Sequence, residues 1–553
     1  MISIEALSFV YRYKDVSLTA LEDIDLEIEE GESVAIMGAN GSGKTTLARC
    51  INGLLLPSSG EVTVDGLCTY RSEHIPAIRR RVGMVFQNPD NQIVATTVER
   101  EIAFGLENIG IPPARMRQRV TQALRRFELE QYRHHPPHRL SGGEKQRLAI
   151  ASVLAMEPKY LILDEPTSLL DPRGRREVNR MLKQIQAAGK VTVIHITQSP
   201  DEALEADRLI VLSHGRIVLE GSPRTVFQHC DQIRALGLDI PLQMQLERVN
   251  NTKELDQYLG QLFNPEELGP SFSQGRAARS VKISTHNLSH IYNNGLPTHK
   301  EALSGVTMEI REGEFLALVG PIGSGKTTLA QHFNGLLKPT SGRIKIEGQD
   351  LWKKGINLQK VRQKVGLIFQ FPEFQLFEEK VGEDVAFGPR NLGIAEEEVE
   401  QRVRRALEAV ELDFDSFSQR SPMHLSQGEK RRVAIAGVLA MDPEVIVLDE
   451  PTVGLDLRGT KQMVRILRDL HRQGKTIVLI SHNMDLVAQV SKRITVLSEG
   501  KVVLTGSLKD LFSNPGLVVS IGLELPQIIG IAKGVRMKKQ SSGQLHWSSL
   551  VAN

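Results

Sequence analysis

The sequence has few cysteines, few aromatic residues and almost no net charge. Only three cysteines occur in 553 residues, at positions 50, 68 and 230, and no two of them are spaced as CxxC. They provide neither a disulfide framework nor a metal cluster, so a reducing cytoplasm is the expected environment. Lys+Arg 68 against Asp+Glu 66 gives a formal net charge of +2, so no general electrostatic field favours nucleic acid, and no nucleic-acid partner is expected.

Long apolar runs are also missing. The first residues, MISIEALSFVYRYKD, lack the basic-then-apolar pattern of a signal peptide. The most apolar late run, LVVSIGLELPQIIGIA, is interrupted by Glu524 and Pro526, which makes it a poor membrane span. No transmembrane segment is therefore expected, and a role at a membrane would require a partner.

What the sequence does contain is a long internal repeat. The stretch GANGSGKTTLARCINGLLLPSSGEV (38–62) returns as GPIGSGKTTLAQHFNGLLKPTSGRI (320–344). The stretch LSGGEKQRLAIASVLAMEPKYLILDEPTSLLD (140–171) returns as LSQGEKRRVAIAGVLAMDPEVIVLDEPTVGLD (425–456). The motifs keep their order and nearly their spacing, and the chain is too long for one ordinary core. The repeat therefore predicts a duplicated domain.

We predict a first domain at 1–250, a polar linker at 251–280, a second domain at 281–535 and a tail at 536–553 with no counterpart in the first half. Within each half, short apolar runs such as VAIM, YLILD and VTVIHIT alternate with longer helical patterns, which is typical of an α/β domain with a largely parallel sheet. The stretches PARMRQRVTQALRRFELE and AEEEVEQRVRRALEAVEL predict amphipathic helices whose charged faces are solvated.

Each half contains one match to G-x-x-x-x-G-K-[ST], directly after an apolar strand. Glycines let the backbone come close to phosphate oxygens, which consecutive N–H groups then bind. A single match can arise by chance in a glycine-rich turn, but two in the same context predict two nucleotide sites. Their lysines would reach the β- and γ-phosphates, and the threonines that follow would coordinate Mg²⁺. The predicted phosphate-loop residues are Gly38, Ala39, Asn40, Gly41, Ser42, Gly43, Lys44, Thr45 and Thr46 in the first half, and Gly320, Pro321, Ile322, Gly323, Ser324, Gly325, Lys326, Thr327 and Thr328 in the second.

An Asp-Glu pair ends a later apolar strand in each half. Asp164 and Asp449 are predicted to hold Mg²⁺ through water. Glu165 and Glu450 come one residue later and are predicted to act as general bases on an attacking water. Such a pair alone is usually a simple strand-to-loop transition. Because it follows a phosphate loop by about 120 residues in both halves, it predicts nucleotide hydrolysis.

The stretches LSGGE and LSQGE resemble the signature motif of ATP-binding cassette (ABC) ATPases. The remaining motifs of that family are also present. They are the Gln loops VFQNP and IFQFP, which contain Gln87 and Gln370, and the D-loops SLLD and VGLD. The resemblance implies tandem P-loop NTPase domains, each with a mainly parallel sheet core, a helical subdomain and an antiparallel β part. It also implies that a tyrosine stacks on adenine in each half. This residue would be Tyr11 in the first half, with Tyr13 as an alternative, and Tyr292 in the second. The ATP contacts that it adds are Tyr11, Gln87, Ser141, Gly142, Gly143, Tyr292, Gln370, Ser426, Gln427 and Gly428, with Gln87 and Gln370 also contacting Mg²⁺.

The segments after the Gln loops, VFQNPDNQIVATTVEREIAFGLENIGI and IFQFPEFQLFEEKVGEDVAFGPRNLGI, resemble the two unequal ATPases of energy-coupling factor (ECF) importers. This resemblance implies a peripheral protein on the cytoplasmic face of the membrane. Its partners would be a membrane T-component and an S-component that captures a vitamin, a vitamin precursor, or cobalt or nickel ions. Coupling helices of the T-component would dock after each Gln loop. There Asp90 and Glu373 are either partners for its basic residues or simply exposed loop acids.

Three alternatives differ from this interpretation: two are other classes of ABC protein and one is a transporter with a different membrane partner. Soluble tandem ABC proteins of the translation-factor type act on ribosomes and usually carry a long charged helical linker, whereas the linker here is short and mixed in charge. A tandem ATPase of a sugar importer would also lack membrane spans, but the NPDNQ…AFG pattern is less expected there. DNA-repair relatives insert zinc motifs or coiled coils, which the cysteine spacings exclude.

The two halves differ where the family places a histidine that contacts the γ-phosphate. His482, in LISHNMD, fits that position. In the first half an ungapped alignment gives Thr197, whereas the motif pattern gives Gln198, which we prefer. His195 lies about 10 Å back along the strand, on the opposite face, and is expected to be a packing residue.

A second departure falls in the signature. In the family the two cassettes pair head to tail, so the Lys44 site would be completed by 426–429 and the Lys326 site by 141–144. Gln427 replaces a glycine that lets the signature backbone approach the γ-phosphate. Gln198 and Gln427 would therefore both belong to the Lys44 site, which is predicted to be weakened but not inactive.

Overall fold

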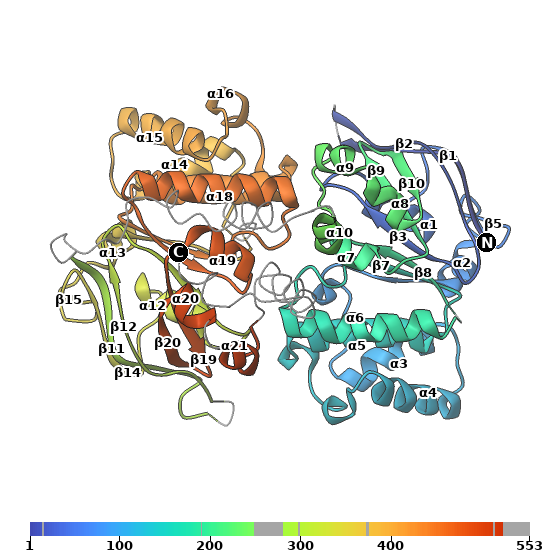
Figure 1. The fold of residues 1–553 in the computed structure, drawn as a ribbon, viewed down its shortest axis with the longest axis horizontal. Helices are drawn as coiled ribbons and strands as arrows, with labels where there is room; N and C mark the ends of the chain where they lie inside the picture. The colour runs from blue at the N-terminus through green and yellow to red at the C-terminus, as the bar shows by residue number, and fades with distance from the viewer. Residues whose placement is uncertain are drawn as a thin grey trace, which may run out of the picture. The chain divides into compact units, whose positions relative to one another are not determined.

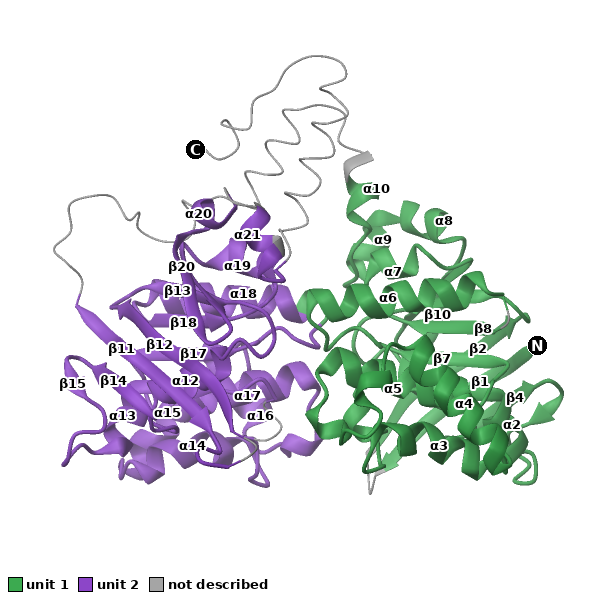
Figure 2. Ribbon diagram, turned by 90° about the horizontal axis from the view of Figure 1, so that it is seen from below, with its two compact units in different colours: residues 1–248, 456–458 green, residues 249–455, 459–553 purple. Residues whose placement is uncertain are grey.

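The computed structural model describes residues 1–13, 16–189, 191–247, 280–296, 299–371, 375–512 and 515–523 (Figure 1). The chain divides into two compact units, residues 1–248 with 456–458, and residues 249–455 with 459–553 (Figure 2). Nearly all of the predicted linker and the whole predicted tail lie outside the described residues, so the domain boundaries stay predictions. No helix in the described part combines the length and apolarity needed to cross a bilayer.

The first unit is built on two sheets. An antiparallel sheet has the order β2-β1-β4-β5, with β1 at Ile2–Tyr13, β2 at Val16–Ile28, β4 at Ser59–Val64 and β5 at Leu67–Cys68. The second sheet has the order β10-β9-β3-β8-β7-β6, with β3 at Ser33–Met37, β6 at Val82–Val85, β7 at Tyr160–Asp164, β8 at Thr192–Ile196, β9 at Arg208–Ser213 and β10 at Arg216–Gly221. All its pairs are parallel except the edge pair of β10 with β9.

The second unit repeats this arrangement. Its antiparallel sheet has the order β12-β11-β14-β15, with β11 at Val281–Tyr292, β12 at Lys300–Arg311, β14 at Ser341–Ile346 and β15 at Gln349–Asp350. Its larger sheet has the order β16-β17-β18-β13-β19-β20, with β13 at Phe315–Val319, β16 at Val365–Ile368, β17 at Val445–Asp449, β18 at Thr476–Ile480, β19 at Arg493–Ser498 and β20 at Lys501–Ser507. The predicted α/β fold with a mainly parallel sheet and an antiparallel part is confirmed in both halves.

Helices complete each unit (Figure 1). In the first unit they are α1 (Lys44–Ile51), α2 (Ile75–Arg81), α3 (Val98–Asn108), α4 (Pro113–Arg126), α5 (Gly142–Ala155), α6 (Pro172–Ala187), α7 (Pro200–Ala203), α8 (Pro223–Gln228), α9 (Cys230–Ala235) and α10 (Leu242–Glu247). In the second they are α12 (Lys326–Phe333), α13 (Leu358–Lys364), α14 (Val381–Asn391), α15 (Glu396–Ala409), α16 (Phe414–Phe417), α17 (Gln427–Leu439), α18 (Leu457–Arg472), α19 (Met484–Val490), α20 (Leu508–Phe512) and α21 (Pro515–Ser520).

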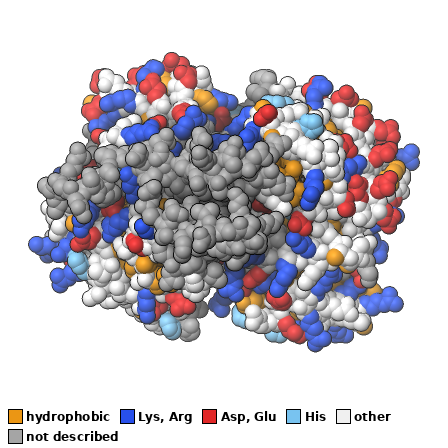
Figure 3. Space-filling view, in the orientation of Figure 1, with side chains coloured by type: hydrophobic (Ala, Val, Ile, Leu, Met, Phe, Trp, Pro, Cys, Tyr) orange, Lys and Arg blue, Asp and Glu red, His pale blue; other side chains and the backbone are white. Residues whose placement is uncertain are grey.

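The two arginine-containing stretches form the predicted amphipathic helices α4 and α15. Helix α4 buries Val120, Ala123 and Leu124 against α3 and α5, while most of its arginines are exposed. The helical subdomain therefore has its own apolar core, made where the period of 3.6 residues places apolar side chains on one face. On the face that Figure 3 shows, acidic and basic side chains are interspersed, as the near-zero net charge suggests.

The strands β3, β6, β7 and β8 and their counterparts β13, β16, β17 and β18 are buried at every position, which explains their continuous apolar runs. Because these strands run parallel, their carboxyl ends meet at one edge of the sheet. The phosphate loop follows β3, and the Asp-Glu pair ends β7. The same edge in the second unit carries the loop after β13 and the Asp-Glu pair of β17.

Candidate nucleotide sites

The phosphate loop of each unit is packed so closely that side chains would not fit at two of its glycines. A Cβ at Gly38 would lie 2.5 Å from the carbonyl oxygen of Leu212, and one at Gly43 would lie 2.5 Å from that of Ala20. Gly43 also has φ +103°, a left-handed conformation that glycine adopts without steric cost. The loop is therefore held against its own unit, with helix α1 beginning at Lys44.

The loop lysines are buried and bound to the loop itself. Lys44 Nζ donates to the carbonyl oxygens of Gly38 (2.7 Å) and Ala39 (2.9 Å). Lys326 Nζ donates in the same way to Gly320 and Pro321, at 2.7 Å each. Burial lowers the pKa of Lys44, and the nearby carboxylates of Glu165 and Asp164 act against that shift. Each unit thus places an ammonium group against two backbone carbonyl oxygens of its own phosphate loop.

One polar atom in the first loop favours an anionic ligand. The Ser42 side chain is 4% exposed, and its hydroxyl is buried without a hydrogen-bond partner in the structure. A buried hydroxyl normally finds a partner, and a phosphate oxygen would supply one. The loop and its lysine therefore fit a nucleotide phosphate.

A threonine hydroxyl and an aspartate carboxylate lie side by side in both units. Thr45 Oγ1 donates to Asp164 Oδ2 at 2.9 Å, and Thr327 Oγ1 donates to Asp449 Oδ2 at 2.6 Å. Burial raises the pKa of both aspartates, in the case of Asp449 to about 6. A hydroxyl and a buried carboxylate are hard oxygen ligands that fit Mg²⁺, which is usually held by one or two carboxylates together with phosphate oxygens.

No group of three or more His, Cys, Asp or Glu residues suited to a metal occurs among the described residues. Of the predicted metal contacts, Thr45, Asp164, Thr327 and Asp449 are thus brought together in pairs.

In the first unit, two glutamine side chains surround Glu165. Gln198 Nε2 donates to Glu165 Oε1 at 2.8 Å, and Gln87 Nε2 donates to Oε2 at 2.9 Å. Gln198 also contacts Asn40 Oδ1 of the phosphate loop at 2.7 Å. The Glu165 side chain is 9% exposed, and burial raises its pKa while Lys44 and the Gln198 hydrogen bond oppose the rise.

In the second unit, a histidine and a serine take those places. His482 donates to Glu450 Oε1 from its backbone N (2.9 Å) and from Nδ1 (2.6 Å). Ser481 Oγ donates to the other oxygen, Oε2, at 3.1 Å. Both oxygens of the carboxylate are therefore oriented by residues at the end of β18. The motif pattern singled out His482 but missed Ser481, although the dipeptide Ser-His in the sequence contains both residues.

The corresponding hydroxyl of the first unit has a different acceptor. Thr197 Oγ1 donates to Glu202 Oε2 at 2.6 Å, away from Glu165. His195 lies within the buried strand β8, and its Nε2 is 3.6 Å from the same carboxylate. The geometry thus pairs Gln198, and neither Thr197 nor His195, with Glu165.

The two tyrosines lie above the first turn of the helix after each loop. Tyr11 OH is 3.2 Å from Thr46 Oγ1, and Tyr292 OH is 3.2 Å from Thr328 Oγ1. Tyr11 is 38% exposed and Tyr292 36%, so both keep an accessible ring. The Tyr13 side chain lies outside the described residues.

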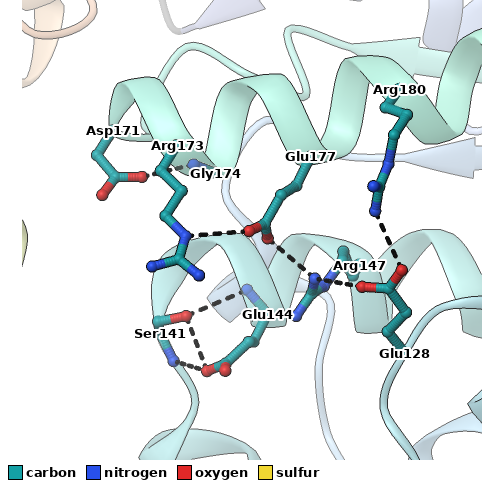
Figure 4. A network of polar contacts seen from close by, with 9 residues as sticks. All are labelled: Glu128, Ser141, Glu144, Arg147, Asp171, Arg173, Gly174, Glu177 and Arg180. Atoms are coloured by element: carbon teal, nitrogen blue, oxygen red, sulfur yellow. Dashed lines mark hydrogen bonds and ion pairs between the residues drawn. The ribbon is translucent and has the colours of Figure 1, made fainter. Parts of the chain in front are cut away.

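Each signature segment begins a helix with a capping box. In α5, Ser141 Oγ accepts from the Glu144 N–H, and Glu144 Oε2 accepts from the Ser141 N–H at 2.7 Å (Figure 4). Figure 4 also shows Arg147 of α5 bonded to Glu177 of α6 at 2.9 Å. Ser426 and Glu429 form the same box in α17, with Gln427 as the first helical residue. The extra side chain therefore leaves the local fold of the signature unchanged.

Comparison with known proteins agrees with this geometry. The family model described as ABC transporter matches residues 21–168 and 303–453. An ABC transporter ATP-binding protein of Caldanaerobacter subterraneus subsp. tengcongensis is 38% identical over 546 residues, with 94% of each chain covered. One of Methanosarcina mazei is 38% identical over 97% of this chain and 94% of its own. The solved structure of cbiO1 from Clostridium perfringens, described as part of the ABC transporter complex cbiONQ, is 40% identical over 44% of this chain and 98% of its own, with a TM-score of 0.39.

The chain belongs to the ABC transporter family and carries two of its ATP-binding cassettes, one in each unit. Its family implies binding and hydrolysis of ATP. The individual roles of the site residues above stay predictions.

We expect Lys326→Ala to abolish ATP binding at the second site, because the ammonium held at the loop would be lost as a phosphate ligand. Equilibrium titration with a fluorescent ATP analogue in the presence of Mg²⁺ should show one site fewer than in the unsubstituted chain. Lys44→Ala is the matched variant and should remove the other site. Unchanged stoichiometry in Lys326→Ala would contradict the assignment.

We expect Asp449→Asn to stabilise the metal-free second unit at neutral pH. Because the folded pKa is about 6 and the usual value is 3.8, the folded state binds more protons between these values, and stability falls as pH rises through that range. The increase in the free energy of unfolding caused by Asp449→Asn should therefore be near zero at pH 4 and reach at most about 3 kcal/mol above pH 7. Unfolding in EDTA at several pH values measures it, with the exposed Asp469→Asn as control. A gain independent of pH would contradict the explanation.

Proposed function

We propose that the chain is the ATP-hydrolysing subunit of an ECF-type importer and drives uptake of a vitamin, a vitamin precursor, or cobalt or nickel ions through separate membrane subunits. It would act as a peripheral protein on the cytoplasmic face of the membrane. The observation that carries the importer proposal is an apolar groove beside the Gln loop of the second unit. The groove has a volume of about 430 Å³ and is lined by, among others, Leu376, Phe377, Phe387, Val433, Val438 and Met441.

The rim of the groove exposes large apolar side chains. Phe377 is 62% exposed and Phe387 44%, and their rings meet edge to face with centroids 4.7 Å apart. Asp384 accepts from the backbone N–H of Phe377 (3.3 Å) and Glu378 (3.2 Å), which holds the loop in place. An exposed aromatic pair on a fixed loop is suited to an apolar helix of a partner.

The first unit has a similar loop. Glu101 accepts from the N–H groups of Val94 (2.9 Å) and Ala95 (2.8 Å), and Val94 and Phe104 are 66% and 47% exposed. Asp90 forms an ion pair with Lys145 at 2.7 Å while 61% of its side chain is exposed. Since such exposed pairs contribute little energy, Asp90 remains free to exchange partners. Glu373 lies outside the described residues.

In the proposed hydrolysis, Glu450 accepts a proton from the water that attacks the γ-phosphate, and His482 and Ser481 fix the orientation of the Glu450 carboxylate. Lys326 and the loop amides bind the phosphates. Thr327 and Asp449 would hold Mg²⁺, which offsets the negative charge of the phosphates. Tyr292 would stack on adenine, and Gln370 would contact Mg²⁺.

The first site has the corresponding loop lysine, threonine, Asp-Glu pair and tyrosine, but Gln198 stands where the second site has His482. Glutamine can neither take up a proton nor carry a positive charge, although its amide still hydrogen-bonds Glu165. Gln427, in the signature predicted to complete this site, is a second departure. We therefore propose that ATP binds at the first site and is hydrolysed slowly there.

Replacing the two glutamates should reveal this inequality. Glu450→Gln should lower steady-state ATPase activity by about 10²–10⁴-fold, because the second site loses its base. Glu165→Gln should leave most of the activity, and Gln198→His should raise turnover by a smaller factor. Initial rates with saturating MgATP on the assembled complex measure all three. Equal losses from the two glutamate substitutions would show that the sites are equivalent.

The partner is tested by fractionation. The chain expressed alone should remain in the supernatant, and co-expression with a T-component should bring it to the membrane fraction. Phe377→Ser should weaken that association several-fold by removing apolar contact area, while ATP binding is kept. Val503→Ser, which changes an apolar side chain of β20 that is 44% exposed, is the control. Co-sedimentation with ribosomes in place of membranes would favour a soluble tandem ABC protein of the translation-factor type. Association with the membrane subunits of a sugar importer would favour a tandem sugar-importer ATPase.

A further inference from the structure

Both proposed general bases lie in a strained turn. Glu165 has φ +47° and Glu450 φ +49°, in the left-handed region that residues with a side chain rarely adopt. Such a conformation persists only where the surroundings hold it. The contacts that hold this turn therefore decide where the carboxylate lies.

In the first unit, the Gln loop reaches the turn directly. Ser168, three residues after Glu165, donates its hydroxyl to the Glu165 carbonyl oxygen at 3.0 Å. The same hydroxyl accepts from Gln87 Nε2 at 3.3 Å, and Gln87 also contacts the Glu165 carboxylate. A serine hydroxyl and a glutamine amide thus connect the Gln loop to the turn.

The second unit lacks that hydroxyl, because Val453 stands at the position of Ser168. Its connection comes instead from Arg431 of the signature helix α17. Arg431 Nη1 donates to the carbonyl oxygens of Pro451 (2.9 Å) and Val453 (2.7 Å), both in the turn after Glu450. Its Nη2 donates to the carbonyl oxygen of Gln370 in the Gln loop at 3.0 Å.

Arg431 has a shorter counterpart in the first unit. The aligned stretches LSGGEKQ and LSQGEKR place Gln146 at the position of Arg431, and both side chains are 1% exposed. Gln146 Nε2 has no hydrogen-bond partner in the structure. Each unit therefore connects its Gln loop to the turn after the glutamate in one way. The first unit uses Ser168, and the second, which has Val453 there, uses Arg431 in place of Gln146.

We propose that Arg431 is a positioning residue of the second site, which holds the turn of Glu450 in place and ties it to the Gln loop. The inference rests on the proposed role of Glu450 as the base. The planar guanidinium presents several donors in a fixed fork, so one side chain can hold two loops with charge-assisted hydrogen bonds. The Gln loop adjoins the apolar groove. A displacement of this loop would then be transmitted through Arg431 to the turn that holds Glu450.

The test uses the full chain with Glu165→Gln, so that turnover reports the second site. Arg431→Gln should lower kcat by about 10- to 100-fold, the effect of a small misplacement of a reacting group, while KM for MgATP changes less than about twofold. Arg432→Gln is the matched control. The neighbouring Arg432 donates to the carbonyl oxygens of Val410 (3.3 Å) and Glu411 (2.9 Å), away from the turn, and its loss should leave kcat unchanged.

Restoring the connection of the first unit should rescue the enzyme. Val453→Ser added to Arg431→Gln supplies the hydroxyl that Ser168 provides in the first unit, and kcat should rise several-fold above that of Arg431→Gln alone. If Arg431→Gln lowers the melting temperature too far for assay, Arg431→Lys replaces it. A single ammonium cannot span both loops, so the same loss of kcat is expected.

The outcomes separate this inference from the function on which it rests. Full turnover in Glu450→Gln would show that Glu450 is not the base. Lost turnover in Glu450→Gln with unchanged kcat in Arg431→Gln would overturn the positioning role alone. Equal losses in the Arg431 and Arg432 variants, or no rescue by Val453→Ser, would mean that Arg431 serves only general stability.

Discussion

The site in each unit depends on one constraint, the parallel order of the central strands. Because β3, β7 and β8 run in the same direction, the phosphate loop, the Asp-Glu pair and the glutamine after β8 all meet at their carboxyl ends. The strands are buried throughout, so this edge is where polar groups can gather. Carboxylates and an ammonium then lie in a largely desolvated space, which raises the pKa of the acids and lowers that of Lys44.

The same edge supports two different arrangements around the glutamate. In the first unit, amide groups of Gln87 and Gln198 hydrogen-bond both carboxylate oxygens of Glu165. In the second, His482 and Ser481 orient Glu450, and Arg431 holds the following turn. A neutral amide and an imidazole both donate a hydrogen bond, but only the imidazole can also take up a proton and carry a positive charge. The duplicated fold is therefore consistent with unequal chemistry.

The first unit also contains a buried carboxylate, Glu202, that the second unit lacks. Glu202 accepts hydrogen bonds from Thr167, Thr197 and Asn179. By structural correspondence along the strand and helix, Leu486 takes the place of Glu202 in the second unit. A buried carboxylate needs several donors, so it takes the Thr197 hydroxyl that would otherwise lie near Glu165. A difference outside the motifs, Glu202 against Leu486, thus changes which hydroxyl lies beside the proposed base.

The sequence by itself determined the duplication, the fold class and the glycine-rich loops and Asp-Glu pairs that lie together at the sheet edge, because glycine spacing, apolar runs and Asp-Glu pairs are local patterns. It left Gln198 and Thr197 as rivals, since a one-residue shift cannot be resolved by counting along a single chain. Only the tertiary structure decided which of them contacts Glu165, because the contact depends on which side chain after β8 points toward the end of β7, where Glu165 lies. The partners of Ser168, Ser481 and Arg431 were likewise decided by packing between segments far apart in sequence.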